Sequence, residues 1–115
     1  MIFCFDIDGT ICTNTDGDYE HAEPFPEVIE RINRLAEEGH SILLQTARGF
    51  TTGIDWRSVT EDQMARWGVT YESLTLGKPT ADVYIDDKGL NFYDWFRNGL
   101  SPQFAPQIEA PENKS

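Results

Sequence analysis

The sequence predicts an α/β fold, a single three-layer domain in which helices cover both faces of a mainly parallel sheet. Three observations lead to this prediction. With 115 residues, the chain is long enough for one hydrophobic core but not for two. Its segments follow the order strand, helix, strand, helix, strand, strand, helix. The first strand segment is apolar on both faces, as strands buried in a parallel sheet are.

Four short apolar runs are the predicted strands of this sheet. Runs of this length between turn residues are typical of buried strands, and the first of them stops abruptly at Asp6. The runs cover residues 2–7, 41–46, 73–77 and 82–87.

Three helices are predicted between and after these strands. In the first, Pro26 suits the opening turn and Gly39 ends the helix. In the second, Thr60 and Gln63 have the spacing of a capping box, and Gly68 ends the helix. The helices cover residues 24–40, 60–68 and 91–96, with irregular segments at 12–23 and 49–59. The apolar face of the first helix consists of Val28, Ile29, Ile32, Leu35 and Ala36.

Composition and charge argue against several partners and compartments. A formal net charge of −11 disfavours nucleic acid and anionic membranes as partners, because both require a basic face. No apolar run approaches about 18 residues, so neither a membrane span nor a signal peptide is expected. Cys4, expected in the core, and Cys12 make a poor disulfide framework, which indicates a reducing, cytoplasmic compartment. The domain is expected to span residues 1–101, and the proline-bearing tail at 102–115 is expected to be flexible.

Polar side chains follow the ends of all four predicted strands. Because ligands of open parallel sheets bind outside the carboxyl ends of the strands, these side chains are candidate site residues. Two bare carboxylates about 5 Å apart repel each other by roughly 3 kcal/mol at an effective dielectric constant of about 20, so a cation is expected beside them. The residues are Asp6 and Asp8 after the first strand, Thr46 after the second, Lys78 after the third, and Asp86 and Asp87 after the fourth.

The same residues carry a family resemblance. The stretch Asp-Ile-Asp-Gly-Thr at 6–10, the strand-terminal Thr46, the Lys78-Pro79 pair and the aspartates at 86–87 resemble the four motifs of the haloacid dehalogenase-like phosphatases, over residues 1–96. The stretches GDYEHAEPFPEVIERI, TAR and YESLTLGKP are similar to the small capsule or surface-polysaccharide biosynthesis phosphatases of that superfamily. The resemblance implies a Rossmann-like domain.

The chemistry of phosphate ester hydrolysis gives these residues roles. Asp6 is the candidate nucleophile, which would form an aspartyl phosphate. Asp8 could protonate the leaving oxygen and then activate water. Gly9 permits a tight turn whose N–H groups would face the phosphate. Thr46 and Lys78 would supply a hydroxyl and an ammonium to the phosphoryl oxygens.

Oxygen-only ligation fits Mg²⁺ as the expected cofactor. The resemblance implies that the Asp6 carboxylate and the Asp8 main-chain carbonyl bind the metal. It also favours Asp87 as a direct ligand, with Asp86 behind it. Asn91 stands where the fourth motif commonly ends with a further acid.

Other residues near the predicted site have two interpretations. Gly9 and Thr10 are expected beside the substrate. Arg48 could hold a substrate phosphate or carboxylate, or it could form a structural salt bridge within this acidic chain. Trp56 and Arg57 could form a wall for a sugar ring, and core packing is the alternative for Trp56.

The sequence leaves no room for an inserted cap domain after the first or the second motif. The resemblance therefore implies a member of the superfamily without a cap and with an open site, which accepts a large substrate or uses a neighbouring subunit of a homo-oligomer as the lid. The resulting hypothesis is a Mg²⁺-dependent phosphomonoesterase acting on a sugar phosphate in polysaccharide precursor synthesis. The alternatives are a phosphatase for a protein or nucleic-acid end, and a catalytically silent domain that binds phosphorylated ligands.

Overall fold

The computed structural model describes residues 1–98, which fall into two compact units, Met1–Thr80 and a second unit that begins at Ala81. Each unit is described by itself. The predicted domain boundary near residue 101 and the predicted flexible tail lie outside the described residues.

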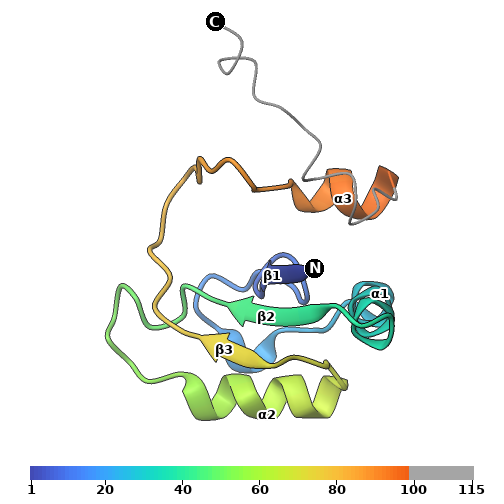
Figure 1. Ribbon diagram of the computed structural model, residues 1–115. Helices are drawn as coiled ribbons and strands as arrows, with labels where there is room; N and C mark the ends of the chain where they lie inside the picture. The colour runs from blue at the N-terminus through green and yellow to red at the C-terminus, as the bar shows by residue number, and fades with distance from the viewer. Residues whose placement is uncertain (99–115) are drawn as a thin grey trace, which may run out of the picture. The chain divides into compact units, whose positions relative to one another are not determined.

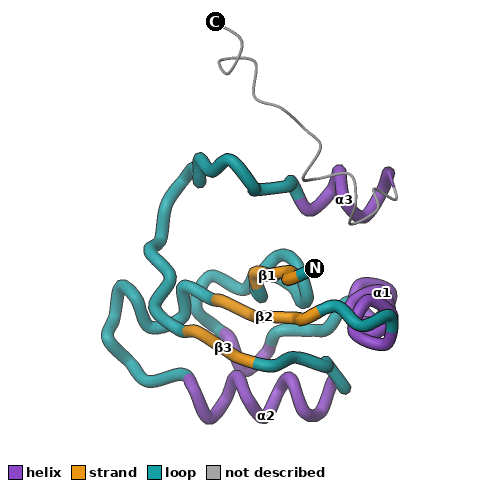
Figure 2. The backbone as a smooth tube through the Cα atoms, in the orientation of Figure 1, coloured by secondary structure: helices purple, strands orange, loops and turns teal. Residues whose placement is uncertain are grey.

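A parallel sheet forms the centre of the first unit (Figures 1 and 2). Its strands are β1 (Ile2–Asp6), β2 (Ser41–Gln45) and β3 (Ser73–Thr75), in the order β1-β2-β3. In the register, Phe5 is opposite Leu44, which is opposite Leu74. All three side chains are buried, so the predicted parallel sheet is confirmed with one well-packed face.

Two helices connect these strands, α1 (Pro26–Glu37) and α2 (Arg57–Trp67). Both crossovers step in the same direction along the sheet, and right-handed crossovers of that kind place their helices on the same face. The side chain of Asn33 in α1 links the two helices, because it donates to the Gly68 carbonyl at 2.8 Å and accepts from the Thr70 N–H at 2.9 Å. The α/β class predicted from the sequence is confirmed.

The ends of the helices follow from local chemistry. Pro26 occupies the first turn of α1, as predicted, because its missing N–H has no intrahelical acceptor there. Gly68 ends α2 in the left-handed conformation at φ 72°. However, α2 begins at Arg57, three residues earlier than predicted. Thr60 and Gln63 therefore lie inside the helix and are buried, so the predicted capping box is wrong.

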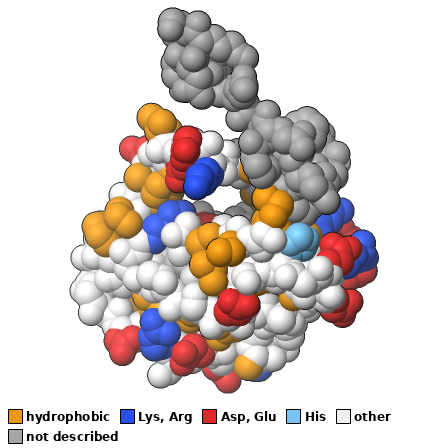
Figure 3. Space-filling view, in the orientation of Figure 1, with side chains coloured by type: hydrophobic (Ala, Val, Ile, Leu, Met, Phe, Trp, Pro, Cys, Tyr) orange, Lys and Arg blue, Asp and Glu red, His pale blue; other side chains and the backbone are white. Residues whose placement is uncertain are grey.

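The other face of the sheet is more open. Ile2 is 72% exposed, and Cys4 is exposed as well, which corrects the expectation that Cys4 is a core residue. The surface of α2 carries charges of both signs. Along the lower edge in Figure 3, acidic and basic side chains lie next to one another. Within α2, Arg57 forms an ion pair with Glu61, and Arg66 forms one with Asp62.

The described part of the second unit contains one helix, α3 (Phe92–Asn98), as predicted. The aromatic rings of Phe92 and Phe96 stack within it, with centroids 5.8 Å apart. The fourth predicted strand is not formed, because residues 82–87 have no ladder partner among the described residues, and the Ile85 side chain is 94% exposed. Within residues 1–98, no helix is long and apolar enough to cross a lipid bilayer.

Candidate active site

Asp6 and Lys78 meet at the carboxyl edge of the sheet. Asp6 is the last residue of β1, and the Lys78 Nζ atom lies 3.7 Å from its Oδ1 atom. Backbone pairing continues past the ends of β2 and β3. The Thr46 N–H donates to the Thr75 carbonyl at 3.0 Å, and the Lys78 N–H donates to the Thr46 carbonyl at 2.9 Å. This extension positions the lysine after a short strand so that its ammonium reaches the carboxylate.

The environment of Asp6 raises its pKa above the ordinary value. Burial of the carboxyl group is the largest cause. The Lys78 ammonium and the Ile7 N–H lower the pKa, whereas the Asp8 charge raises it further. A carboxylate whose charge is poorly solvated in this way is a better nucleophile than one that is surrounded by water.

The turn after β1 is held by its own backbone. The Ile7 carbonyl accepts from the N–H groups of Thr10 and Ile11 at 3.1 and 2.8 Å, and the Gly9 N–H donates to the Cys12 carbonyl at 2.8 Å. The N–H groups of Gly9 and Thr10 are thus bonded to carbonyls of the same turn, and the contact of these two residues with a substrate stays a prediction. Gly9 provides the left-handed conformation, at φ 83°, that the turn requires.

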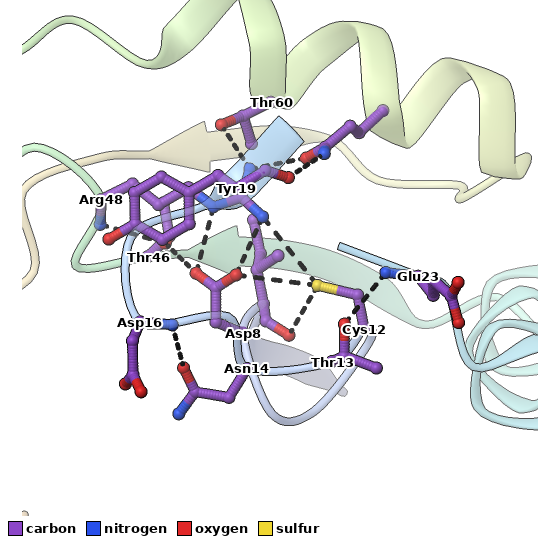
Figure 4. A network of polar contacts seen from close by, with 12 residues as sticks. Asp8, Cys12, Thr13, Asn14, Asp16, Tyr19, Glu23, Thr46, Arg48 and Thr60 are labelled. Carbon is purple, nitrogen blue, oxygen red and sulfur yellow. Dashed lines mark hydrogen bonds and ion pairs between the residues drawn. The ribbon is translucent and has the colours of Figure 1, made fainter. Parts of the chain in front are cut away.

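The side chain of Asp8 takes part in a polar network with Arg48, Thr46 and Cys12 (Figure 4). Its Oδ1 atom accepts from Arg48 Nη2 at 2.9 Å, and its Oδ2 atom accepts from Arg48 Nε at 3.0 Å. The Thr46 hydroxyl donates to Oδ2 at 3.3 Å, and the Cys12 thiol lies 3.7 Å from Oδ1. The Asp8 carboxylate is thus held in a bidentate ion pair with two further donors.

Arg48 is completely enclosed by acceptors. Its Nη1 atom donates to the Thr60 hydroxyl at 3.0 Å and to Gln63 Oε1 at 2.6 Å, and its Nη2 atom lies 3.9 Å from the Cys12 sulfur. The guanidinium carbon lies 4.6 Å from the centroid of the Tyr19 ring, which is also visible in Figure 4. Arg48 as a whole residue is 1% exposed.

A closed flap supplies Tyr19. The Thr13 N–H donates to the Glu23 carbonyl at 2.9 Å, and the Glu23 N–H donates to the Thr13 hydroxyl at 3.0 Å, so the ends of the predicted loop are joined. Between them, the short 3-10 helix η1 (Tyr19–His21) presents the Tyr19 ring. This ring contacts Trp56 edge to face at a centroid distance of 5.0 Å.

Asp6 and Lys78 lie side by side, whereas the side chains of Arg48 and Thr46 both contact Asp8. Of the two interpretations of Arg48, the structure favours the salt bridge. Thr46 is fully buried and donates its hydroxyl proton to Asp8, so it offers none to a phosphoryl oxygen in this arrangement. Trp56 is half-buried against Tyr19, and Arg57 donates to the Leu74 carbonyl at 3.1 Å.

Thr60, Gln63 and Tyr19 are the site residues that the sequence did not reveal. Thr60 and Gln63 lie three residues apart on the inner side of α2, and both are fully buried. The sequence of α2 has no clear apolar stripe that marks its inner side, so it gives little signal that Thr60 and Gln63 are buried there beside Met64. Once they are buried, both polar side chains require partners.

The predicted metal ligands lie in both compact units, and those of each unit are described by themselves. The Asp6 carboxylate and the Asp8 main-chain carbonyl are oxygen donors, which fits a hard cation such as Mg²⁺. Asp86 and Asp87 belong to the second unit, where the Lys88 N–H donates to Asp86 Oδ1 at 2.8 Å and lowers the pKa of Asp86. Within residues 1–98, no three His, Cys, Asp or Glu side chains are grouped closely enough to hold a metal ion.

Comparison with known proteins gives the fold. No family model matches the sequence, and no curated protein matches it either. Among solved structures, an MCSG target from Vibrio cholerae is 23% identical, with a TM-score of 0.79 over 92% of this chain and 94% of that chain.

Two further structures share the fold over a smaller part of their length. A chain of the Pnkp1/Rnl/Hen1 complex is 22% identical, with a TM-score of 0.54 over 75% of this chain and 30% of that chain. The D,D-heptose 1.7-bisphosphate phosphatase from B. bronchiseptica, solved with magnesium and phosphate, is 19% identical, with a TM-score of 0.54 over 70% of this chain and 52% of that chain. These likenesses confirm the α/β fold.

Proposed function

We propose that this protein is a phosphatase that hydrolyses phosphate monoesters through an aspartyl-phosphate intermediate. The observation that supports the proposal most directly is the pair of Asp6 and Lys78 at the carboxyl edge of the sheet, 3.7 Å apart. A carboxylate beside an ammonium is a nucleophile next to a group that stabilises negative charge on a phosphoryl oxygen.

In the first step, a carboxylate oxygen of Asp6 attacks phosphorus and the bond between phosphorus and the ester oxygen breaks. Asp8, protonated for this step, gives its proton to the leaving oxygen, so the alcohol departs neutral. Lys78 stabilises the charge that gathers on the phosphoryl oxygens. The products are the alcohol and a phosphorylated Asp6.

In the second step, Asp8 acts as the base. Its carboxylate takes a proton from a water molecule whose oxygen attacks the phosphorus of the phosphorylated Asp6. The bond between phosphorus and the Asp6 oxygen breaks, which releases inorganic phosphate and restores the Asp6 carboxylate. The proton that Asp8 has gained serves the next turnover.

We propose Mg²⁺ as the cofactor. Asp6 would bind it through the carboxylate, Asp8 through the main-chain carbonyl, and Asp87 through its carboxylate, with Asp86 behind Asp87. When bound, Mg²⁺ would screen the repulsion between the anionic nucleophile and the anionic substrate. This assignment rests on the motif resemblance and on the oxygen-only donor set.

We propose a sugar phosphate as the substrate, in the synthesis of polysaccharide precursors. The similarity of three sequence stretches to the small capsule or surface-polysaccharide phosphatases supports this choice. The name of the B. bronchiseptica neighbour, a heptose bisphosphate phosphatase, is consistent with it. The net charge of −11 disfavours a polyanionic substrate such as a nucleic acid.

The test is phosphate release from a panel of sugar phosphates, nucleotides and p-nitrophenyl phosphate, with Mg²⁺ and with EDTA. The proposal predicts release that requires Mg²⁺ and is fastest with one sugar phosphate. Activity that is indifferent to EDTA would overturn the metal assignment. No release from any compound by folded protein would favour a macromolecular substrate or a role in binding only.

A further inference from the structure

The geometry points to Arg48 as a positioning residue that holds the general acid and base, Asp8, in one orientation. This inference rests on the proposed phosphatase function. It assigns to Arg48 a contribution to proton transfer, in place of the contact with substrate that the sequence suggested as one alternative.

The guanidinium group has no donor left for a substrate. Its five N–H groups match five acceptors, since Nε bonds to Asp8, Nη1 to Thr60 and Gln63, and Nη2 to Asp8 and Cys12. With its side chain fully buried, Arg48 cannot reach an incoming phosphate unless these contacts break.

The contacts restrict Asp8 to one plane. A bidentate Arg–carboxylate pair fixes both carboxylate oxygens, in contrast to a single hydrogen bond, about which the carboxylate can rotate. Thr46 reinforces this arrangement, because its hydroxyl donates to Asp8 Oδ2 at 3.3 Å and accepts from the Arg48 N–H at 3.2 Å. The Asp8 side chain retains 17% exposure, so it stays accessible to a substrate at the edge of the sheet.

Two chain segments besides the turn that carries Asp8 hold the guanidinium itself. Thr60 and Gln63 approach it from α2, and the Tyr19 ring covers it from the flap. Gln63 also joins α2 to the flap, since its Nε2 atom donates to the Tyr19 carbonyl. A catalytic group is placed accurately when its neighbours are themselves held by packing and hydrogen bonds.

Stability alone gives a weak reason for this network. The desolvation of two buried charges often cancels their attraction, so apolar residues of similar volume frequently stabilise a protein as well or better. An enclosed arginine that contacts the proposed proton donor with both arms of its fork is better explained by the orientation that it imposes.

The test compares Arg48→Lys with Arg66→Lys. Lysine keeps the charge but lacks the planar fork. Arg66 is a matched control, because it pairs with Asp62 at 2.9 Å on the exposed side of α2 and does not contact Asp8. For each variant, kcat and KM are measured with p-nitrophenyl phosphate, whose leaving group needs little protonation, and with glycerol phosphate, whose leaving group needs a proton.

The expected result is a split between the two substrates. Arg48→Lys should lower kcat/KM for glycerol phosphate on the order of a hundredfold, while kcat/KM for p-nitrophenyl phosphate falls only a few-fold. The ratio kcat/KM covers only the steps up to the phosphorylated Asp6, so it excludes the second step, in which Asp8 serves as the base for both substrates. Arg66→Lys should match the unmodified protein. An equal fall in kcat/KM for both substrates would mean that Arg48 has a structural role only or that it binds substrate. Either outcome would overturn the inference.

A second variant covers the case in which Arg48→Lys does not fold. Thr60→Val removes one acceptor of Arg48 while keeping the shape of the side chain, and it should give the same split with a smaller magnitude. Combining Asp8→Asn with Arg48→Lys should reproduce the ratio of the two kcat/KM values found for Asp8→Asn alone, since both changes act on the same proton transfer to the leaving oxygen.

Thermal unfolding of Asp8→Asn, Arg48→Lys and the double variant separates the two ways of failing. Non-additive shifts in Tm show that the ion pair forms, whether or not the protein is an enzyme. Coupled Tm shifts in a protein without turnover would overturn the phosphatase proposal, and the positioning role with it. Turnover with an unchanged ratio of kcat/KM between the two substrates would overturn the positioning role alone.

Discussion

At the scale of single residues, the protonation state of Asp6 that the fold stabilises differs from the state that the proposed reaction requires. Its pKa is raised mainly by burial, so the ionised form that would attack phosphorus is also the form that the fold disfavours. Asp6→Asn is therefore expected to reduce phosphate release to the uncatalysed background. In EDTA at neutral pH, the same variant is expected to unfold at a higher temperature than the unmodified protein.

The pH dependence of this difference follows from linkage. Between the unfolded value of 3.8 and the raised folded value, the folded state binds more protons than the unfolded state, so stability falls as pH rises. The higher unfolding temperature of Asp6→Asn should therefore be absent below that pH range and fully developed above it. Asp62→Asn is the control, because Asp62 is exposed. A Tm advantage independent of pH would contradict the explanation, and full activity of Asp6→Asn would remove the covalent mechanism.

The two cysteines are predicted to differ in reactivity. Burial raises the pKa of Cys12 to about 12, with the charge of Asp8 as the second cause. The Cys12 thiolate is therefore scarce at neutral pH. Cys12 is also fully buried, whereas Cys4 is exposed. A thiol reagent at neutral pH should modify Cys4 in the folded protein and Cys12 only after unfolding. Rapid modification of Cys12 in folded protein would contradict the closed network around Arg48.

At the scale of structural elements, the loop between β2 and α2 depends on glycine where it turns back. Gly49 has φ 84°, and a Cβ atom there would lie 2.5 Å from the Ile54 carbonyl oxygen. Gly53 has φ 74°, but a Cβ atom there would meet nothing within 4 Å. Gly53→Ala should therefore cost about 1–2 kcal/mol of unfolding free energy, which is the penalty of the left-handed conformation alone.

Gly49→Ala should cost more than Gly53→Ala, since backbone must also move away from the new methyl group. Gly49 directly follows Arg48, so this movement should also lower the turnover of glycerol phosphate. Urea unfolding and phosphate release measure the two effects. Equal unfolding free energies for the two variants would show that the loop adjusts without strain.

The elements that the sequence predicted correctly are those whose signal is local. The apolar runs of β1 and β2, and the proline and glycine at the ends of α1, need no knowledge of distant partners. The start of α2 was missed because polar Thr60 resembles a capping residue, whereas its partner Arg48 is 12 residues away in the sequence. The run at 82–87 was predicted as a strand from its composition, but a strand also needs a neighbouring backbone.

The same distinction applies to the candidate site. Asp6 and Lys78 were predicted to meet because parallel strands end at one edge, and the structure brings them together. The orientation of Asp8 was not predictable, since it depends on an arginine, a helix and a flap that a motif does not describe. Spacing in the sequence therefore identified the reacting groups, while their alignment required the folded chain.

At the scale of the whole molecule, the chain is strongly acidic, with a formal net charge of −11. Most aspartates and glutamates among residues 1–98 are exposed, so any of them could attract a cation weakly. A specific requirement for Asp86 and Asp87, the metal ligands proposed from the motif resemblance, is therefore shown by comparison with a neighbouring aspartate. Asp82, in the same segment as Asp86 and Asp87, offers that comparison.

Asp87→Asn is predicted to weaken activation by Mg²⁺ most strongly. The loss of a carboxylate that ligates the metal directly should raise the Mg²⁺ concentration for half-maximal activity by more than about 100-fold. Asp86→Asn should raise it by about 10-fold to 100-fold, as the loss of a group that supports a ligand does. Asp82→Asn should leave this concentration unchanged.

The measurement is phosphate release at increasing Mg²⁺, with calorimetric titration of Mg²⁺ into each variant as a readout that does not depend on turnover. A larger effect of Asp86→Asn would reverse the assignment within the pair. The absence of any effect from either substitution would mean that the metal is held without this segment, and that Asp6 and the Asp8 carbonyl have partners elsewhere in the chain.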